Sequence, residues 1–572
     1  MLCNLEESNV PLKPIYDKAP LMKLNSLPLR PGQARVAQSR ATALYRMTGD
    51  VTNKPALWEG VFRLACVVTG EPMEQPVVKC IRSYLDLQGE DGLLPGSVAD
   101  AVAVLRAAWA MYEYDAQRPL LEKIALWCGW ACEHWEIVLA DSDVRVHPAD
   151  LMELLCSLYR VTGMKAVLSL CERLRAEGMD WSGALHTFSV QRGMKRMMPW
   201  NELEEGMVKE NRRESGFYTR QYLTCHAQTL ADGLRAAMAA GRYSGSRTEL
   251  SAAKTGWERI SRYHGAVCGG TTADELLGGA TPECGVSAAS LGAWAEAFAA
   301  VDEPWAYEAL DVLVRNGLAA AVCGGEVLQM QRVNGLAADC GEADCYHVSE
   351  NAQQRALGRL CRGYAAAISS AVTQQPGGPQ VNLALPGKYM TVQEAGRMLL
   401  TLEGEECRWS LHVHVKENLR AALRIRIPAW TKDMSVMVNG LAVNADSKDS
   451  CVTLDRTWSD GDTVTVELDC QVRVVESGYH QSACVMRGNT VMVYPAAKDM
   501  AWNMALHGKV ELNDKGEVTA ILRRAPAWRC RGDVPVDLPV LPETEGDSVC
   551  AVLRPYAETP CRIALLPRGK QA

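Results

Sequence analysis

The stretch Asp150-Leu-Met-Glu-Leu-Leu-Cys-Ser-Leu-Tyr-Arg-Val-Thr-Gly163 places apolar residues three and four positions apart, the spacing of an amphipathic α-helix. Asp150 can cap its start, and Gly163 can adopt the left-handed conformation that ends many helices. The same Thr-Gly ending occurs at residues 43–49, ALYRMTG, and at residues 63–70, RLACVVTG. Another helical stretch follows each of them. The first two thirds of the chain are therefore predicted to be helix hairpins arranged as a toroid or solenoid.

The pattern changes after about residue 370. Gln374-Gln-Pro-Gly-Gly-Pro379 breaks the helical spacing and marks a candidate domain boundary. Beyond it, short runs alternate between Val, Ile or Leu and polar residues, and Asn439-Gly440 is a strong hairpin-turn signal. The runs at 411–415, 423–427, 436–438 and 464–468 predict half-buried strands. Regularly spaced short strands indicate a β-sandwich, so a large all-α domain should precede an all-β domain.

Composition limits the classes of function. The 572 residues carry 60 Lys and Arg against 68 Asp and Glu, a net charge of −8, which argues against a nucleic-acid partner. No apolar run approaches the ~18 residues of a membrane span, so no membrane partner is expected. The N-terminus shows no secretory signal, which predicts a cytoplasmic protein. The 21 cysteines, spread along the chain, are expected to be mostly reduced, buried thiols.

The residues best suited to catalysis or metal binding lie between 264 and 347. Asp274 and Glu275 are adjacent carboxylates that follow a Gly- and Thr-rich break in the helical pattern. Glu283, Cys284, Cys340 and Cys345 form a candidate four-ligand set, because soft thiolates with one carboxylate suit Zn²⁺. The alternative for each cysteine is an ordinary buried thiol.

For other candidate site residues, the surrounding sequence favours a structural role. Cys128, Cys132 and His134 share an apolar helix region that is expected to be core. His412 and His414 share one face of a strand, which predicts a solvated or packed strand face. The sequence contains no phosphate-binding GxxxxGK[ST] motif, no dinucleotide fingerprint and no serine nucleophile elbow.

Four passages of the chain resemble glycoside hydrolase family 127, the β-L-arabinofuranosidase family. The most specific is the strand series Leu423-Arg-Ile-Arg-Ile-Pro-Ala-Trp430 with Val438-Asn-Gly440, Arg456-Thr-Trp458 and Arg487-Gly488. The other three passages are Trp58-Glu-Gly60 with Leu87–Leu93, Cys225-His-Ala227 with Tyr263-His-Gly265, and Ala273–Gly278 with Thr281-Pro-Glu-Cys284. The resemblance implies a multidomain α + β chain, in which an (α/α)6-type helical toroid precedes all-β sandwich modules. The implied divisions are a lead segment at 1–34, a catalytic toroid at 35–372 and a β-sandwich region at 380–572.

The resemblance also implies a retaining mechanism with a cysteine nucleophile beside Zn²⁺ and a glutamate acid/base. Glu275 matches the acid/base and Cys345 the nucleophile, while His226, Tyr263, Asp274 and Asn334 match positions that contact sugar or have an undefined role. From its position alone, His226 would be a hydrogen-bonded structural residue of a helix start. The zinc ligands would be Glu283, Cys284, Cys340 and Cys345.

Two positions depart from the family pattern. The family has adjacent cysteines where this chain has Cys345-Tyr346, so Cys340 or His347 would have to replace the second thiolate. An ungapped match places Cys284 on the family cysteine but Pro282 on the family glutamate, whereas a one-residue shift places Glu283 there.

Three hypotheses follow for the function. The first is a retaining glycosidase that hydrolyses small L-arabinofuranosyl or related oligosaccharides; a homodimer is left open. The second is a non-catalytic or weakly active carbohydrate-binding relative with a degenerate metal site. The third is conventional hydrolysis by two carboxylates drawn from Asp274, Glu275 and Glu342, with purely structural zinc.

Overall fold

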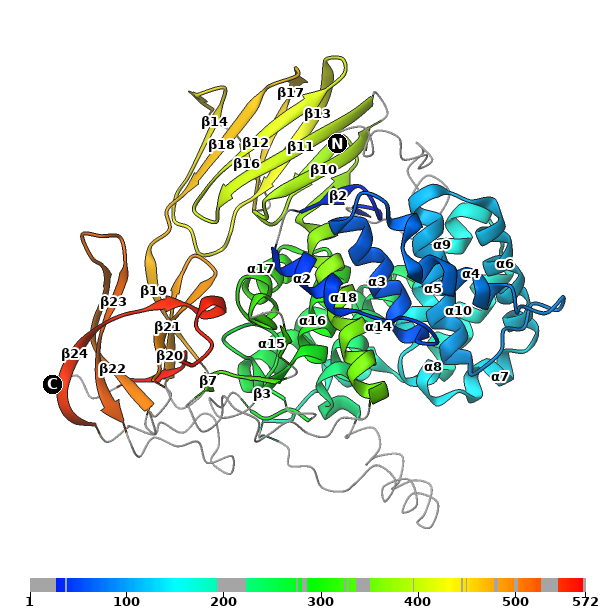
Figure 1. The fold of residues 1–572 in the computed structure, drawn as a ribbon, viewed down its shortest axis with the longest axis horizontal. Helices are drawn as coiled ribbons and strands as arrows, with labels where there is room; N and C mark the ends of the chain where they lie inside the picture. Colours follow the sequence, from blue (N-terminus) through cyan, green and yellow to red (C-terminus); the bar gives the residue numbers. More distant parts are fainter. Residues whose placement is uncertain are drawn as a thin grey trace, which may run out of the picture.

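The computed structural model describes the chain from residue 27 to residue 568, and Figure 1 shows its arrangement. The residues outside the description are 1–26, 37–38, 192, 194–222, 274–275, 280–284, 324–325, 329, 336–349, 394–395, 444–445, 449, 478–481, 498–502, 526–543 and 569–572. Helices occupy the part before residue 372, and strands dominate the part after it. This order confirms the predicted fold class.

Six helices form a closed inner ring, in which each helix packs against the next and the last packs against the first. They are α3 (Pro55–Val68), α5 (Val98–Asp115), α9 (Pro148–Thr162), α14 (Ala227–Ser244), α16 (Ala288–Val301) and α18 (Glu350–Ala371). Further helices pack outside this ring: α2 (Ser39–Met47), α4 (Pro76–Leu85), α6 (Arg118–Glu133), α10 (Ala166–Glu177), α15 (Arg247–His264) and α17 (Pro304–Leu313). The closed ring of six is the (α/α)6 toroid.

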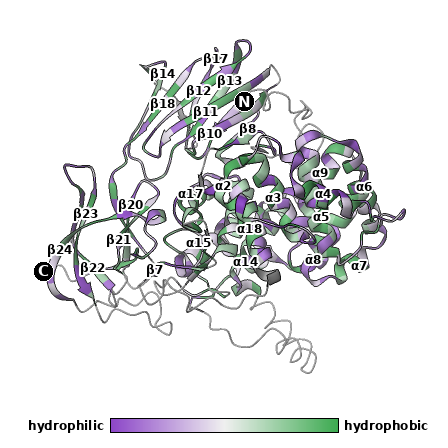
Figure 2. Cartoon of the chain, viewed as in Figure 1, coloured by the Kyte–Doolittle hydropathy of each residue, from purple (hydrophilic) through white to green (hydrophobic). Residues whose placement is uncertain are grey.

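Helix α9 shows how local sequence sets these elements. Gly163 ends the helix with φ 72°, the left-handed conformation that was predicted. The predicted cap at Asp150 is wrong, because Pro148 starts the helix and His147 precedes it. Asp150 therefore lies in the first turn, and its carboxylate is directed to residues of other helices. Many helices carry both hydrophobic and hydrophilic residues, as Figure 2 shows.

Two antiparallel-rich sheets form a β-sandwich beside the toroid (Figure 1). The larger contains β2 (Ala34–Arg35), β10 (Gly387–Gln393), β11 (Gly396–Glu405), β12 (Arg408–Val415), β18 (Thr463–Leu468), β14 (Met434–Val438) and β15 (Leu441–Ala442). The smaller contains β1 (Leu27–Pro28), β8 (Val372–Gln375), β9 (Gly378–Val381), β13 (Leu419–Arg426), β17 (Cys451–Trp458) and β16 (Asp446–Lys448). Residues from before the toroid thus pair with strands from after it.

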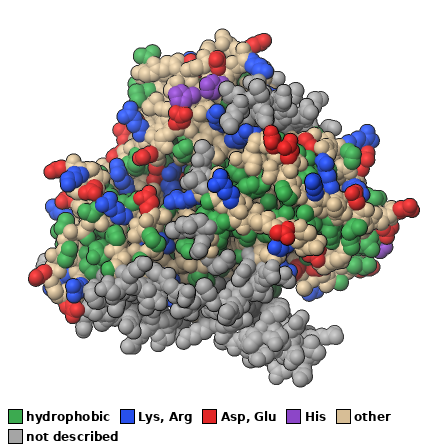
Figure 3. All heavy atoms as spheres, viewed as in Figure 1, with side chains coloured by type: hydrophobic (Ala, Val, Ile, Leu, Met, Phe, Trp, Pro, Cys, Tyr) green, Lys and Arg blue, Asp and Glu red, His purple; other side chains and the backbone are tan. Residues whose placement is uncertain are grey.

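The four strand runs predicted from alternation lie in β12, β13, β14 and β18. Asn439 and Gly440 form the predicted hairpin turn with φ 52° and 78°, a conformation that favours Asn and Gly. On β12, His412 and His414 are 39% and 46% exposed, so this strand face is solvated. Acidic and basic side chains are interspersed over the described surface seen in Figure 3.

A further β module follows the sandwich. Its main sheet contains β19 (Val472–Glu476), β20 (Ser482–Arg487), β21 (Thr490–Pro495) and β26 (Arg562–Ile563), and it ends on β7 (Asn334–Gly335) of the toroid region. β25 (Arg554–Pro555) and β27 (Leu566–Pro567) join the same sheet. The strands β22 (Asn503–Leu512), β23 (Val518–Ala525) and β24 (Glu545–Val552) form a separate small sheet.

Most of the free cysteines that the structure describes are buried, as predicted for reduced thiols, and Cys407 and Cys470 form a disulfide that joins the β11–β12 turn to the end of β18. None of the described helices combines the length and the apolar character that a membrane crossing requires.

Candidate functional site

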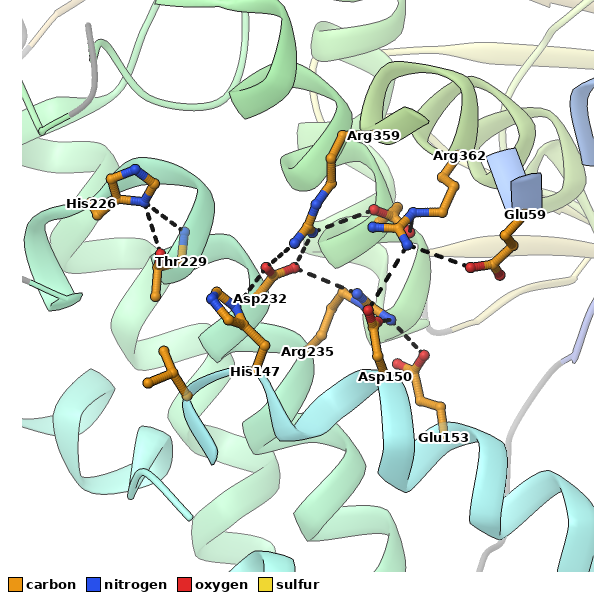
Figure 4. A network of polar contacts seen from close by, with 12 residues as sticks. Glu59, His147, Asp150, Glu153, His226, Thr229, Asp232, Arg235, Arg359 and Arg362 are labelled. Carbon is orange, nitrogen blue, oxygen red and sulfur yellow. Dashed lines mark hydrogen bonds and ion pairs between the residues drawn. The ribbon is translucent and has the colours of Figure 1, made fainter. Parts of the chain in front are cut away.

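A network of charged side chains crosses the axis of the toroid (Figure 4). Its members come from all six inner helices: Glu59 and Arg63 from α3, Arg106 and Glu113 from α5, Asp150 and Glu153 from α9, Asp232 and Arg235 from α14, Glu296 from α16, and Arg359 and Arg362 from α18. His147, at the start of α9, joins them through Asp232. The apolar faces of the helices hold the ring together, and these charges fill its centre.

Two arginines connect α3, α5, α9 and α14. Arg106 donates from Nε to Glu59 at 2.7 Å and from Nη1 to Asp150 at 2.6 Å. Arg235 donates to Glu153 at 2.6 Å and lies 2.9 Å from Asp150. Burial alone would raise the pKa of the Asp150 carboxyl, but Arg106 and Arg235 hold that pKa well below its usual range. Asp150 is therefore an anion at neutral pH.

Asp232 connects α14 to α18 and to the start of α9. Its two carboxylate oxygens accept from the two terminal nitrogens of Arg359, and His147 Nδ1 lies 2.9 Å from Oδ2. The Asp232 side chain is 2% exposed, yet Arg359 and the hydrogen bond from His147 outweigh burial and keep its pKa well below its usual range.

Parts of this network are open to solvent although they lie inside the ring. The side chains of Glu153 and His147 are 36% and 28% exposed, whereas those of Asp232 and Arg235 beside them are almost completely buried. Carboxylates, guanidinium groups and an imidazole are the groups that bind sugar hydroxyls by hydrogen bonds. The axis thus offers a polar surface of a kind that suits a carbohydrate.

A small strand framework contains described residues that are adjacent in the chain to the predicted catalytic residues. β3 (Gly285–Ser287) pairs with β6 (Met330–Arg332), and Ala273 lies beside Val286 of β3. The N–H of Ala273 donates to Gly285 O, and that of Leu277 donates to Cys225 O, each at 2.8 Å. Leu276 forms a bridge with His226. The described residues next to positions 274–275, next to position 284 and next to His226 are thereby brought together.

The six other predicted site residues lie outside the described residues: Asp274, Glu275, Glu283, Cys284, Cys340 and Cys345. Within the described part of the chain, no group of three His, Cys, Asp or Glu side chains is arranged to hold a metal ion. The predicted zinc ligands therefore stay a prediction.

His226 and Tyr263 are half-buried and come from different elements. His226 precedes α14, and its Nδ1 accepts the Thr229 N–H at 3.3 Å and lies 2.8 Å from Thr229 Oγ1 (Figure 4). Because Nδ1 is an acceptor there, the neutral ring carries its proton on Nε2. Tyr263 lies near the end of α15, where Gln191 Nε2 is 3.5 Å from its hydroxyl.

Asn334 is 4% exposed, and its amide is used by the C-terminal module. Its Oδ1 accepts the N–H groups of Ala564 and Leu565 at 2.8 and 2.9 Å. Its Nδ2 donates to Leu565 O at 2.8 Å and to Asn503 Oδ1 at 3.1 Å. These bonds give Asn334 a role in joining β7 to β26.

Three helices of the inner ring begin where the predicted residues occur in the chain. His226 directly precedes α14, Cys284 lies four residues before α16, and Cys345 lies five residues before α18. Because one outer helix returns the chain between each of these helices, their N-termini face the same end of the toroid.

His264 holds the loop that follows α15 in place through two hydrogen bonds. It is fully buried, its Nε2 donates to Val190 O at 2.9 Å, and its Nδ1 accepts the Gly279 N–H at 3.1 Å. The acceptor role of Nδ1 requires the neutral ring. Burial lowers the pKa of His264 to about 4, against the raising effect of the Val190 hydrogen bond.

This arrangement predicts a loss of stability in mild acid. The pKa of His264 is lower in the folded than in the unfolded chain, so the unfolded state binds more protons between pH 6.5 and 4. The stability contributed by the neutral ring, about 3 kcal/mol, is present above pH 6.5 and is lost as the pH falls to about 4. Thermal unfolding of wild type and His264→Gln, from pH 7.5 to 4.5, measures it. The Gln variant should be less stable at pH 7.5 and lose less stability on acidification; parallel curves would contradict the assignment.

The described cysteines near this framework are poor nucleophiles. Burial raises the pKa of Cys225 to about 11, and it also raises that of Cys268. Both are protonated thiols at neutral pH, whereas a nucleophile must be a thiolate.

The charged network was missed in the sequence. Glu59 lies between Trp58 and Gly60 on the apolar face of a helix, and a charge at such a position is a signal for a buried ion pair. Its partner Arg63 is four residues away on the same helix, but its partners Arg106 and Arg362 are 47 and 303 residues away and cannot be found in this way.

Comparisons with known proteins show which of them this chain is similar to. The family model for the middle domain of GH127 β-L-arabinofuranosidases matches residues 387–470, which span the larger sandwich sheet from β10 to the disulfide at Cys470. A search of the curated proteins finds no match to the sequence.

Among solved structures, one described as a glycoside hydrolase is 14% identical with a TM-score of 0.69, over 98% of this chain and 100% of that one. A GH127 β-L-arabinofuranosidase from Geobacillus stearothermophilus T6 is 16% identical with a TM-score of 0.64, over 93% and 94%. The GH127 β-arabinofuranosidase BT3674 is 13% identical with a TM-score of 0.64, over 95% and 98%. At these identities the structures establish a shared fold across almost the whole chain. The chain therefore carries a match to the GH127 middle domain at residues 387–470, and its fold is similar to that of solved GH127 β-L-arabinofuranosidases.

Proposed function

We propose that this protein is a retaining glycoside hydrolase that acts on small L-arabinofuranosyl or related oligosaccharides. The match to the middle domain of a glycoside hydrolase family carries this proposal and supports glycoside hydrolysis as the class of activity. The charged network of the inner helices and the framework around positions 273, 276 and 285 add support, because the first supplies groups that can bind sugar hydroxyls and the second consists of described residues adjacent in the chain to the predicted catalytic positions.

In the proposed reaction, the Cys345 thiolate attacks the anomeric carbon and forms a carbon–sulfur bond. The glycosidic carbon–oxygen bond breaks at the same time, and Glu275 gives its proton to the leaving oxygen. Water then attacks the same carbon, Glu275 takes a proton from it, and the carbon–sulfur bond breaks to restore the thiolate. Two successive displacements retain the configuration of the sugar.

The residues Glu283, Cys284, Cys340 and Cys345 are proposed as the ligands of Zn²⁺. Three thiolates and one carboxylate suit this ion, and the pairing of Gly285 with Arg332 holds the described residue next to Cys284 against β6, which ends three residues before Gly335, the last described residue before Cys340. With Zn²⁺ bound, ligating thiols are deprotonated at neutral pH, at which a free cysteine is mostly protonated.

The zinc content of protein purified without added metal tests the ligand set. We expect close to one zinc ion per chain by elemental mass spectrometry, and a large loss in Cys284→Ser. Cys225→Ser is the matched control, because Cys225 is a buried thiol near the same framework. A folded wild-type protein that holds no zinc and takes up none would exclude the cysteine mechanism.

A second candidate function is carbohydrate binding without turnover. The observation that favours it is Tyr346, which stands where the family has the second of two adjacent cysteines. Fewer thiolate ligands would weaken metal binding and leave Cys345 less fully ionised. A cytoplasmic location and a homodimeric state are also proposals, and a cytoplasmic enzyme would act on imported oligosaccharides.

A further inference from the structure

The C-terminal module reaches back to the toroid at the strands that flank the predicted catalytic positions. β26 pairs with β7, so that Arg562 lies opposite Gly335 and Ile563 opposite Asn334. Among the residues that the structure describes, the Asn334 side-chain amide forms four hydrogen bonds, and all of them go to residues between 503 and 565. The C-terminal module thus occupies both the oxygen and the nitrogen of this amide.

A second contact holds the neighbouring strand β6. Arg562 is 3% exposed, and its guanidinium lies 3.6 Å from the centre of the Tyr556 ring. It donates to Tyr556 O and Thr559 O at 3.1 and 2.7 Å, and to Gln331 Oε1 at 3.3 Å. Gln331, itself 3% exposed, donates to Gly317 O of the toroid at 2.7 Å. The arginine therefore links the C-terminal module to the toroid through Gln331.

Strand β6 also pairs with β3, the strand that follows Cys284 in the chain, and Gly285 of β3 accepts the N–H of Ala273. The chain leaves β7 at Gly335 toward Cys340 and Cys345. One clamp, formed by Asn334, Gln331, Tyr556 and Arg562, is thus attached to the described ends of all three stretches that carry the proposed catalytic and metal-binding residues.

We propose that Asn334 and Arg562 are positioning residues for the glycosidase reaction. The C-terminal segment 554–567 is then required for full turnover by the catalytic toroid and is more than an appended module. The inference rests on the proposed function for its effect on turnover. The contacts that form the clamp involve only residues that the structure describes. Misplacement of a reacting group by about 1 Å costs roughly 10²-fold in rate, so a loosened clamp should reduce turnover before it unfolds the protein.

The test compares Asn334→Ala with Asn489→Ala. Asn489 is a matched control, because it is 2% exposed and its amide also crosses between modules, donating to Glu308 and Asp311 of α17 at 3.0 Å each. Both variants should unfold at lower temperature. Well below both unfolding temperatures, only Asn334→Ala should lose kcat, by at least about tenfold. Arg562→Lys, which keeps the charge but not the planar guanidinium contacts, should show a smaller loss of the same kind.

Hydrogen exchange gives a readout that needs no substrate. Amides of residues 285–287 and 330–335 should exchange at least about tenfold faster in Asn334→Ala than in wild type, and stay unchanged in Asn489→Ala. Equal exchange in both variants would overturn the clamp, whatever the activity. Faster exchange at these strands with unchanged kcat would overturn the positioning role alone. If wild type hydrolyses no arabinofuranoside, the proposed function fails, and the exchange data still decide the clamp. If Asn334→Ala does not fold, Arg562→Lys provides the same comparison.

Discussion

Replacement of Glu275 by glutamine is expected to reduce kcat by about 10²–10⁴-fold while the affinity for an arabinofuranosyl ligand changes little. Glutamine has the shape of the glutamate but can neither give nor take the proton that the leaving oxygen and the attacking water require. The measurement is steady-state hydrolysis of aryl L-arabinofuranosides, with ligand affinity from calorimetry on the same preparations.

Two outcomes separate the hypotheses. A protein that only binds carbohydrate would show no turnover in wild type and unchanged affinity in Glu275→Gln. If Glu275 acts as the acid/base, an aryl leaving group of low pKa should restore much of the lost rate of the first step, because it departs without a proton. In parallel, Cys345→Ser should lose turnover but remain folded; persistent activity in that variant would favour hydrolysis by two carboxylates.

Local sequence predicted the elements well where the physical signal is local. Gly163 ends α9 in a left-handed conformation, and Asn439-Gly440 turns a hairpin, because each needs only the backbone freedom of one or two residues. The β12 and β18 strands followed from side chains that alternate between a buried and an exposed face. The toroid itself was inferred partly from resemblance, and its closure from α18 back to α3 is a contact between distant parts of the chain.

The charged centre of the toroid could not be predicted in the same way. The sequence offers Asp150 as a helix cap, because Asp often caps helices, but Pro148 begins the helix two residues earlier. Its real partners, Arg106 and Arg235, lie on two other helices. The amide of Asn334 is bonded to residues more than 160 positions away. Such contacts depend on how helices and modules pack, which no short pattern encodes.

Removal of Asp232 is expected to cost the most stability. Its carboxylate is held by Arg359, Arg235 and His147 and is 2% exposed. Asp232→Ala therefore takes from the buried Arg359 guanidinium its nearest carboxylate and leaves it with Glu296 at 3.7 Å. Loss of one partner from a buried ion pair typically costs about 3–5 kcal/mol. The matched control is Glu467→Ala, which removes a carboxylate from the exposed pair with Arg408 and should cost less than about 0.5 kcal/mol. Calorimetric unfolding of the full chain compares the two.

The double variant Asp232→Ala with Arg359→Met decides what the network contributes. One reason for Asp232→Ala to be destabilising is the loss of the carboxylate that balances the charge of Arg359. If that loss is the cause, replacing Arg359 by Met as well should restore part of the lost stability, since an apolar side chain needs no counter-charge. If the loss in the double variant instead equals the sum of the two single losses, the coupling energy between Asp232 and Arg359 is zero, and each side chain contributes through its other contacts. A cost for Asp232→Ala as small as that of Glu467→Ala would mean that water entering along the exposed side of Glu153 and His147 screens these charges. The network would then serve as a polar lining for a ligand, and its charges would add little to the stability of the toroid.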